Sequence, residues 1–176
     1  LCTRSEFEKA EQCLEQAEKL GREIGAHHFI AAALGVQGHV LRCTGRHDKA
    51  LERYNESIRI ERGCDSIDSL PEALYGRGSS LFALGRVEDA AKDLRESVEL
   101  YRKIGLAESR DYFMPLSALA HVEEARGNRA EAEQLAVEAE QLARLLGIDE
   151  KHPEFDVRIC YDMTRKLTKK IVKECS

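Results

Sequence analysis

The 176-residue sequence has no tryptophan, only three prolines and no long uninterrupted run of apolar residues. No apolar stretch approaches the roughly 18 residues of a membrane-spanning helix, so we expect no membrane insertion. No segment has the order of regions that defines a secretory signal peptide. With few helix-breaking prolines and 34% charged residues, the composition is typical of a helical protein with charged outer faces. We therefore expect a cytoplasmic protein.

Cysteine is present, but never in a metal-binding or redox arrangement. None of the six cysteines forms a C-x-x-C pair, and no histidine lies at zinc-finger spacing from a cysteine pair. Several fall on apolar faces of predicted helices, where a thiol behaves as a small hydrophobic group. We therefore expect reduced thiols rather than disulfides, no metal site and no cofactor. The cysteines are Cys2, Cys13, Cys43, Cys64, Cys160 and Cys175.

No catalytic motif is present either. There is no G-x-x-x-x-G-K-[ST] sequence, and the glycine-rich segment 76–80 lies inside a predicted helix, where its second glycine, Gly78, has the packing position of the repeat. His27 and His28 are adjacent, so they point about 100° apart on a helix and cannot chelate an ion in the usual way. Glu123 and Glu124 face different directions for the same reason. We expect no enzyme activity and no catalytic residue.

Charge gives little evidence of a partner. The formal net charge is -5, whereas a nucleic-acid-binding domain is typically strongly basic. Five Arg and Lys residues gather between 165 and 173, on the last predicted helix. We interpret them as a solvated face, with a contact for an acidic partner as the alternative. No nucleic-acid partner is expected.

What the sequence does contain is a repeat of 40 residues. The segment GHVLRCTGR at 38–46 matches GSSLFALGR at 78–86, with the same residue at four positions. A third copy runs from Ala120, 42 residues further on, and a partial copy opens the chain with Ala10, Leu14 and Ala17. A period of this length is typical of a helical solenoid, in which each unit buries its apolar face only against a neighbour.

The recurring residues resemble the tetratricopeptide repeat. The copies contain Gly38, Gly45, Ala50, Tyr54 and Ser57, then Gly78, Gly85, Ala90, Leu94 and Ser97, then Ala120, Gly127, Ala132, Ala136 and Ala139. Ala136 departs from the family pattern, which has an aromatic residue or leucine there. The units exceed the usual length of about 34 residues and so resemble the long repeats of kinesin light chains and related bacterial regulators. The resemblance implies an all-α, right-handed α-solenoid of antiparallel helical hairpins.

We expect about eight helices in a single domain over residues 1–176. The predicted parts are a partial repeat over 1–26, repeats over 27–68, 69–108 and 109–150, and a C-terminal capping helix over 151–176. Because the chain begins late in a unit, we interpret it as a fragment of a larger protein. A glycine follows seven of the predicted helices and marks where each ends. These glycines are Gly25, Gly45, Gly63, Gly85, Gly105, Gly127 and Gly147.

Two local features give further predictions. Ser69 followed by Glu72 is a capping-box pattern, which predicts a helix start. Glu123 occupies the position of Leu41 and Leu81 in the other copies, so we expect it to weaken the packing of its unit. The small residues that open each copy, such as Gly38, are expected where paired helices cross closely.

In the tetratricopeptide family the first helix of each hairpin lines a concave groove, which implies the functional surface of this chain. Tyr75 and Phe82 are the expected aromatic anchors. Co-chaperones of the family hold the terminal carboxylate of a chaperone with lysine and asparagine side chains. The corresponding positions here are Gly35, His39 and Ser79, so binding of chaperone C termini is not expected. The predicted groove residues are His39, Arg42, Tyr75, Ser79, Phe82, Ser117, His121 and Glu124.

The leading hypothesis is a non-enzymatic scaffold or adaptor that binds a peptide segment of a partner protein in this groove. The alternative is a regulatory sensor domain, which binds a small effector or signalling peptide near His39, His121 and Glu124 and switches an attached domain. Self-association through the broken first repeat is a third hypothesis. In the simpler interpretation, Phe82 is a core residue. His39 and His121 are then ordinary solvated residues of their helices.

Overall fold

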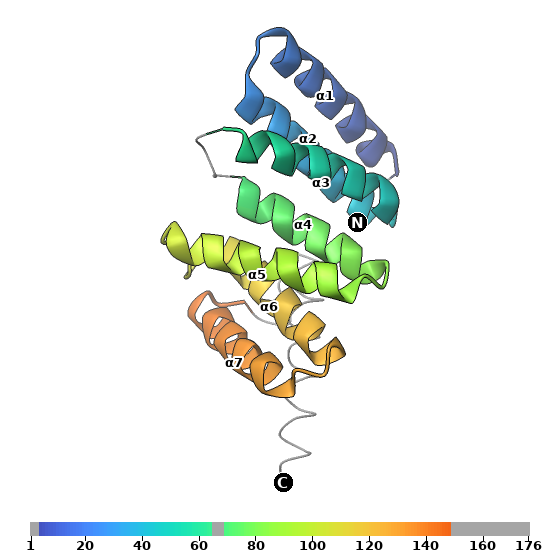
Figure 1. The fold of residues 1–176 in the computed structure, drawn as a ribbon. Coiled ribbons are helices and arrows are strands. Elements are labelled where there is room, and N and C mark those ends of the chain that lie inside the picture. Colours follow the sequence, from blue (N-terminus) through green and yellow to red (C-terminus); the bar gives the residue numbers. More distant parts are fainter. Residues whose placement is uncertain (1–3, 65–68, 149–176) are drawn as a thin grey trace. The chain divides into compact units, whose positions relative to one another are not determined.

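The computed structural model describes residues 4–64 and 69–148, with side chains from residue 14 onward (Figure 1). These residues form helices and turns, which confirms the predicted all-α class. The predicted capping helix over 151–176 lies outside the described residues. The helices are α1 (Arg4–Glu23), α2 (His27–Cys43), α3 (His47–Arg62), α4 (Leu70–Ala83), α5 (Val87–Lys103), α6 (Arg110–Ala125) and α7 (Arg129–Leu145).

The chain forms two compact units, which we describe separately. Unit 1 covers Leu1–Arg86 and contains α1 to α4, and unit 2 covers Val87–Ser176 and contains α5 to α7. In unit 1, α2 packs against α1, α3 and α4, and α3 also packs against α4. In unit 2, α6 packs against both α5 and α7. The pairs α2–α3 and α6–α7 correspond to the first and third predicted hairpins.

The turns inside these two hairpins have the same backbone geometry. Gly45 has a φ of 73°, and the next amide, of Arg46, donates to the Leu41 carbonyl at 2.8 Å. Gly127 has a φ of 85°, and the next amide, of Asn128, donates to the Glu123 carbonyl at 2.9 Å. Glycine adopts positive φ without a steric penalty, so it ends the helix and reverses the chain within a few residues.

The core of unit 1 is built around Tyr54 of α3, whose side chain is buried. A Cβ atom added to Gly38 of α2 would lie 2.7 Å from Cε1 of this ring, and one added to Gly76 of α4 would overlap it. The ring therefore packs directly against the backbone of both helices. The predicted close crossing at Gly38 is confirmed, and Gly76 provides a second one.

The hairpin α2–α3 has another close contact at Ser57. This fully buried residue of α3 donates a hydrogen bond from its Oγ to the Ala31 carbonyl of α2 at 2.9 Å. Gly35, one turn further along α2, also faces Ser57, since a Cβ there would lie 3.7 Å from the Oγ. The small residue that closes the repeat pattern thus lies where α2 crosses α3.

Glu123 of α6, at the position of Leu41 and Leu81 in the other copies, is fully buried, and its charge is paired. Its carboxylate lies 2.7 Å from Arg95 Nη2 and 2.9 Å from Arg126 Nη1, and it accepts a hydrogen bond from Asn128 Nδ2 at 2.6 Å. A buried carboxylate is stable only when it is paired in this way. The charge therefore joins three elements of unit 2: α5, α6 and the turn before α7.

The predicted capping box at the start of α4 is wrong in its chemistry, although the helix does begin at this point. The Ser69 side chain accepts no capping hydrogen bond. Its hydroxyl instead donates to Oε1 of Glu61, a buried carboxylate near the end of α3. Since a buried carboxylate is costly without a hydrogen-bond donor, the hydroxyl turns toward Glu61.

Candidate functional site

The predicted groove residues of unit 1 lie on two adjacent helices, α2 and α4. The Arg42 guanidinium lies over the Tyr75 ring, 5.6 Å from its centroid, and Arg42 Nη2 lies 3.3 Å from His39 Nδ1. On α4, Tyr75, Ser79 and Phe82 follow at spacings of four and three residues, so they share one face, and all three are half-buried. The structure thus brings His39, Arg42 and Tyr75 together, with Ser79 and Phe82 further along the face that Tyr75 occupies.

Two apolar residues of α2 extend this surface and were not among the predicted residues. Phe29 is 67% exposed and Val36 is 46% exposed, so α2 presents two large apolar side chains to solvent. Phe29, Val36 and the exposed Cys43 follow at intervals of seven residues, so they lie on one face beside His39. This seven-residue spacing is the feature of the sequence from which a shared face could have been predicted. We call Phe29, Val36, His39, Arg42, Tyr75, Ser79 and Phe82 the α2–α4 surface.

The predicted groove residues of unit 2 all lie on α6. Ser117 is buried, so its side chain is not available to a partner in this structure. His121 and Glu124 are half-buried. Burial lowers the pKa of His121, and the nearby Glu124 carboxylate opposes that shift. The His121 Nε2 atom is buried and has no hydrogen-bond partner among the described residues.

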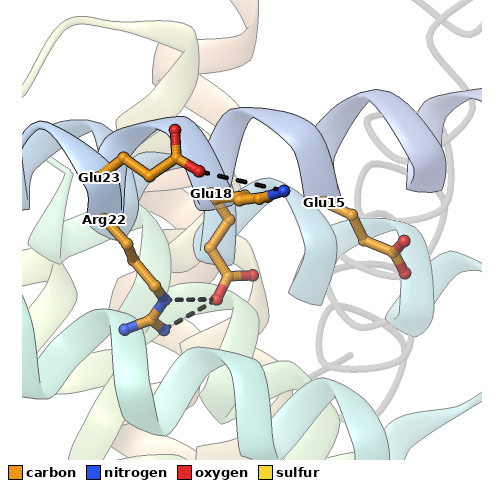
Figure 2. Close-up of a pocket in the computed structure, with 5 residues that line it drawn as sticks. Glu15, Glu18, Arg22 and Glu23 are labelled. Carbon is orange, nitrogen blue, oxygen red and sulfur yellow. Dashed lines mark hydrogen bonds and ion pairs between the residues drawn. The ribbon is translucent and has the colours of Figure 1, made fainter.

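A shallow depression of about 450 Å³ lies along α1 (Figure 2). Its lining is charged and internally paired: Arg22 lies 2.8 Å from Glu18 and 2.6 Å from Glu56 of α3. Burial tends to raise the pKa of Glu18, but hydrogen bonds from Arg22 and Gln37 outweigh it and lower that pKa. These pairs join α1 to α2 and α3, and they indicate a structural role for the depression. It is lined by Glu15, Glu18, Lys19, Arg22 and Glu23.

Over residues 4–64 and 69–148, no group of three or more His, Cys, Asp or Glu side chains is arranged to hold a metal ion. None of the helices in the same ranges is long and apolar enough to cross a bilayer.

Comparison with known families explains the repeat. The family model described as "Tetratricopeptide repeat" matches residues 1–62 and 69–144, which is most of the chain. The chain belongs to the tetratricopeptide repeat family. Such repeats generally mediate protein–protein interaction, and the fold is typically a non-enzymatic scaffold. No curated protein matches the sequence.

Three solved structures have a similar fold. BtubC (BKLC) from P. vanneervenii has a TM-score of 0.63 at 16% identity, and the match covers 96% of this chain and 75% of that one. A Podosopora anserina protein described as a putative kinesin light chain with nearly identical TPR-like repeats has a TM-score of 0.64 at 17% identity, covering 95% and 89%. A variant of that protein has a TM-score of 0.66 at 17% identity, covering 96% and 86%. The predicted resemblance to long, kinesin-light-chain-like repeats is confirmed.

Proposed function

We propose that this tetratricopeptide repeat protein is an interaction scaffold, and that its α2–α4 surface binds an extended or helical segment of a partner protein. The observation that carries this proposal is the exposure of Phe29 at 67% on the same helix as Arg42, which lies over Tyr75. Exposed large apolar side chains, and an aromatic ring with a cation over it, are both typical of protein-binding surfaces.

The chemistry of the surface indicates what the segment contains. Phe29 and Val36 favour apolar side chains, which would be removed from water on binding. Arg42 contacts Tyr75 and His39 and also interacts with the Tyr54 hydroxyl, and a carboxylate or carbonyl oxygen of the segment would be a further acceptor for its guanidinium. One short segment on such a surface gives a dissociation constant in the micromolar range, by order of magnitude.

A pull-down with the intact protein, followed by calorimetric titration of the recovered segment, tests this proposal. We expect Phe29→Ala and Tyr75→Ala each to weaken binding about tenfold, which corresponds to about 1.4 kcal/mol. Val137→Ala in α7 is the matched control, because Val137 is also an exposed apolar helix residue but lies in unit 2. Unchanged affinity in both unit 1 variants would exclude this surface.

A regulatory sensor is the second candidate, and the buried, unpartnered Nε2 of His121 favours it. Such a nitrogen could receive a hydrogen bond from a small effector, with Glu124 one turn away as a second polar group. A thermal-shift screen of signalling peptides and metabolites on the isolated chain tests this function. A compound that stabilises the wild type but not the His121→Ala variant would support it, and no stabilising compound would count against it.

A further inference from the structure

The thiol of Cys43 lies at the end of a row of three polar side chains on α2. Cys43 is exposed, and its Sγ atom lies 3.5 Å from Nε2 of His39. On the other side of the same imidazole ring, Nη2 of Arg42 lies 3.3 Å from Nδ1. A guanidinium, an imidazole and a nucleophilic sulfur are therefore in consecutive contact, beside the α2–α4 surface.

Arg42 determines which nitrogen of His39 carries a proton. A guanidinium group has only donors, so Arg42 donates to Nδ1, and Nδ1 itself carries no proton. The proton of the neutral imidazole is then on Nε2, which donates it to Sγ of Cys43. A thiolate accepts such a hydrogen bond more strongly than a thiol does, because the acceptor is charged. The arrangement therefore stabilises the ionised form of Cys43.

The end of a helix normally disfavours an anion, because its last carbonyl groups carry partial negative charge. At the end of α2 these carbonyls have donors. The Thr44 hydroxyl donates to the Val40 carbonyl at 2.9 Å and to the Leu41 carbonyl at 3.0 Å. The Arg46 amide also donates to the Leu41 carbonyl, at 2.8 Å, and its side chain adds a cation to this helix end. The helix end thus opposes a thiolate at Cys43 less than an uncapped one would.

The other charged and titratable groups around Cys43 come from three helices. On α2, Arg42 provides a cation, which also lies over the Tyr75 ring of α4. Tyr54 of α3 interacts with both Arg42 and Cys43. The exposed Glu72 carboxylate of α4 also acts on Tyr54, and it opposes a further negative charge in this region. The Arg42 cation offsets the Glu72 charge.

The repeat indicates that Cys43 does not serve the packing of unit 1. In the other two copies it corresponds to Ala83 and Ala125, and each of the three is the last residue of its helix. All three positions are exposed. Only the first copy places a thiol four residues after a histidine, so this pair is an addition to the repeat pattern and not a part of it.

Cys64 provides a comparison within unit 1, since it is the other cysteine whose side chain the structure describes. It is half-buried and packs against an apolar cluster. Such surroundings offer a thiolate neither a donor nor a cation, and structural cysteines of this kind are typically inert. Reactive cysteines lie in exposed, electropositive surroundings, which describes Cys43 alone of the two. The cluster consists of Ile30, Ala31, Leu34 and Ile60.

We propose that Cys43 is a modification site, at which its thiolate attacks a small disulfide of the glutathione type and forms a mixed disulfide. The thiol first releases its proton to water. The thiolate then attacks one sulfur of the reagent, a new S–S bond forms as the old one breaks, and the leaving thiolate takes up a proton. The Cys43 sulfur is oxidised and the released sulfur is reduced, so no other oxidant is needed. Carboxylates of such a reagent suit Arg42 and Arg46, the cations beside the thiol.

Incubation of the full chain with glutathione disulfide, followed by peptide mass spectrometry, gives a modification rate for each cysteine. At about pH 7 we expect Cys43 to react at least about tenfold faster than Cys64. His39→Ala should slow the reaction of Cys43 about threefold or more at about pH 7. At about pH 10, where almost every thiol is ionised, this variant should match or exceed the wild-type rate.

His27→Ala is the matched control, because it removes another exposed histidine from the opposite end of the same helix. It should leave the rate at Cys43 unchanged, and circular dichroism confirms that both variants remain helical. Equal rates at Cys43 and Cys64 in neutral solution would overturn the proposal. So would a neutral rate that His39→Ala leaves unchanged, or a loss that is the same in alkaline solution, because His39 would then not act on the thiolate. A covalent dimer through Cys43 in place of the mixed disulfide, seen by electrophoresis without reductant, would make a second copy the reactant and would also overturn it.

Discussion

At the residue scale, Tyr54 determines how closely three helices of unit 1 approach one another. Gly76→Ala would place a methyl group inside this ring, so we expect the free energy of unfolding to fall by about 1–3 kcal/mol, despite the better helix propensity of alanine. Urea denaturation followed by circular dichroism measures the change. In a Tyr54→Leu background, which copies Leu94 of the next repeat, the same substitution should cost less.

Gly35→Ala is the control for this substitution. The added Cβ atom would lie 3.7 Å from Ser57 Oγ, an ordinary contact, so alanine should be neutral or should stabilise by up to about 1 kcal/mol. If Gly76→Ala is as costly in the Tyr54→Leu background as in the wild type, the steric explanation is wrong. The sequence favoured Gly78 because of its place in the repeat, and it offered no reason to single out Gly76.

The Tyr54 hydroxyl gives the stability of the protein a dependence on alkaline pH. Burial raises the pKa of Tyr54 to about 12, with Arg42 opposing that shift, whereas the unfolded chain ionises near pH 10. The folded state therefore binds this proton more tightly. The contribution of this proton to the free energy of unfolding is complete below pH 10. It falls by up to about 2–3 kcal/mol as the pH rises to 12.

Chemical denaturation of wild type and Tyr54→Phe between pH 9 and about 12 tests this expectation. The free energy of unfolding of the wild type should decrease relative to that of the variant above pH 10. Parallel curves would show that Tyr54 ionises equally well in both states. Burial also raises the pKa of Tyr112 in unit 2 to about 12. This residue is present in both proteins, so it affects the wild-type and Tyr54→Phe curves equally.

At the scale of elements, helix ends were predictable because each depends on a few adjacent residues. Every one of the seven predicted glycine positions follows a helix, and six of them have a φ between 64° and 85°. Gly63, at -87°, is the exception. Side-chain caps were less predictable, because a hydroxyl binds the acceptor or donor that tertiary packing brings closest. Ser69 has the capping-box sequence but binds Glu61, whereas Ser109 caps α6 without that pattern.

Ser109 should therefore stabilise α6 as a cap, whereas Ser69 gives α4 no such stabilisation. Its Oγ accepts a hydrogen bond from the Tyr112 amide at 3.1 Å, so Ser109→Ala should lower the free energy of unfolding by about 1 kcal/mol. Ser109→Asp keeps an acceptor and adds a charge that the helix dipole favours, so it should retain the wild-type value. Equal losses in the two variants, measured by urea denaturation, would contradict the capping role.

At the scale of the whole molecule, the repeat predicted the fold, but only part of the candidate surface. Register alone selects positions on the first helix of each hairpin, and three of the residues selected in this way, His39, Arg42 and Tyr75, lie close together in the structure. It could not show that Ser117 is buried, because exposure depends on neighbouring helices that a single repeat does not specify. For the same reason it did not reveal Phe29, whose exposure depends on its surroundings.

The division into two units predicts that a local defect stays local. In repeat proteins, stability is approximately a sum of terms from single repeats and their neighbours. Gly76→Ala should therefore speed amide exchange mainly in α2 to α4. Glu123→Gln removes the buried charge that Arg95 and Arg126 share, although Arg95 keeps Glu131 and Arg126 keeps Glu88, and should cost about 2 kcal/mol, seen as faster exchange in α5 to α7.

Native-state hydrogen exchange of both variants under the same conditions measures this pattern. The control is Glu131→Gln, because Glu131 binds the same Arg95 guanidinium but is 43% exposed, so its loss should cost less than about 1 kcal/mol. Equal acceleration of all helices in either variant would mean that the chain opens only as a whole. The two units would then be a feature of packing and not of cooperativity, and the α2–α4 surface of unit 1 would respond to damage anywhere in the protein.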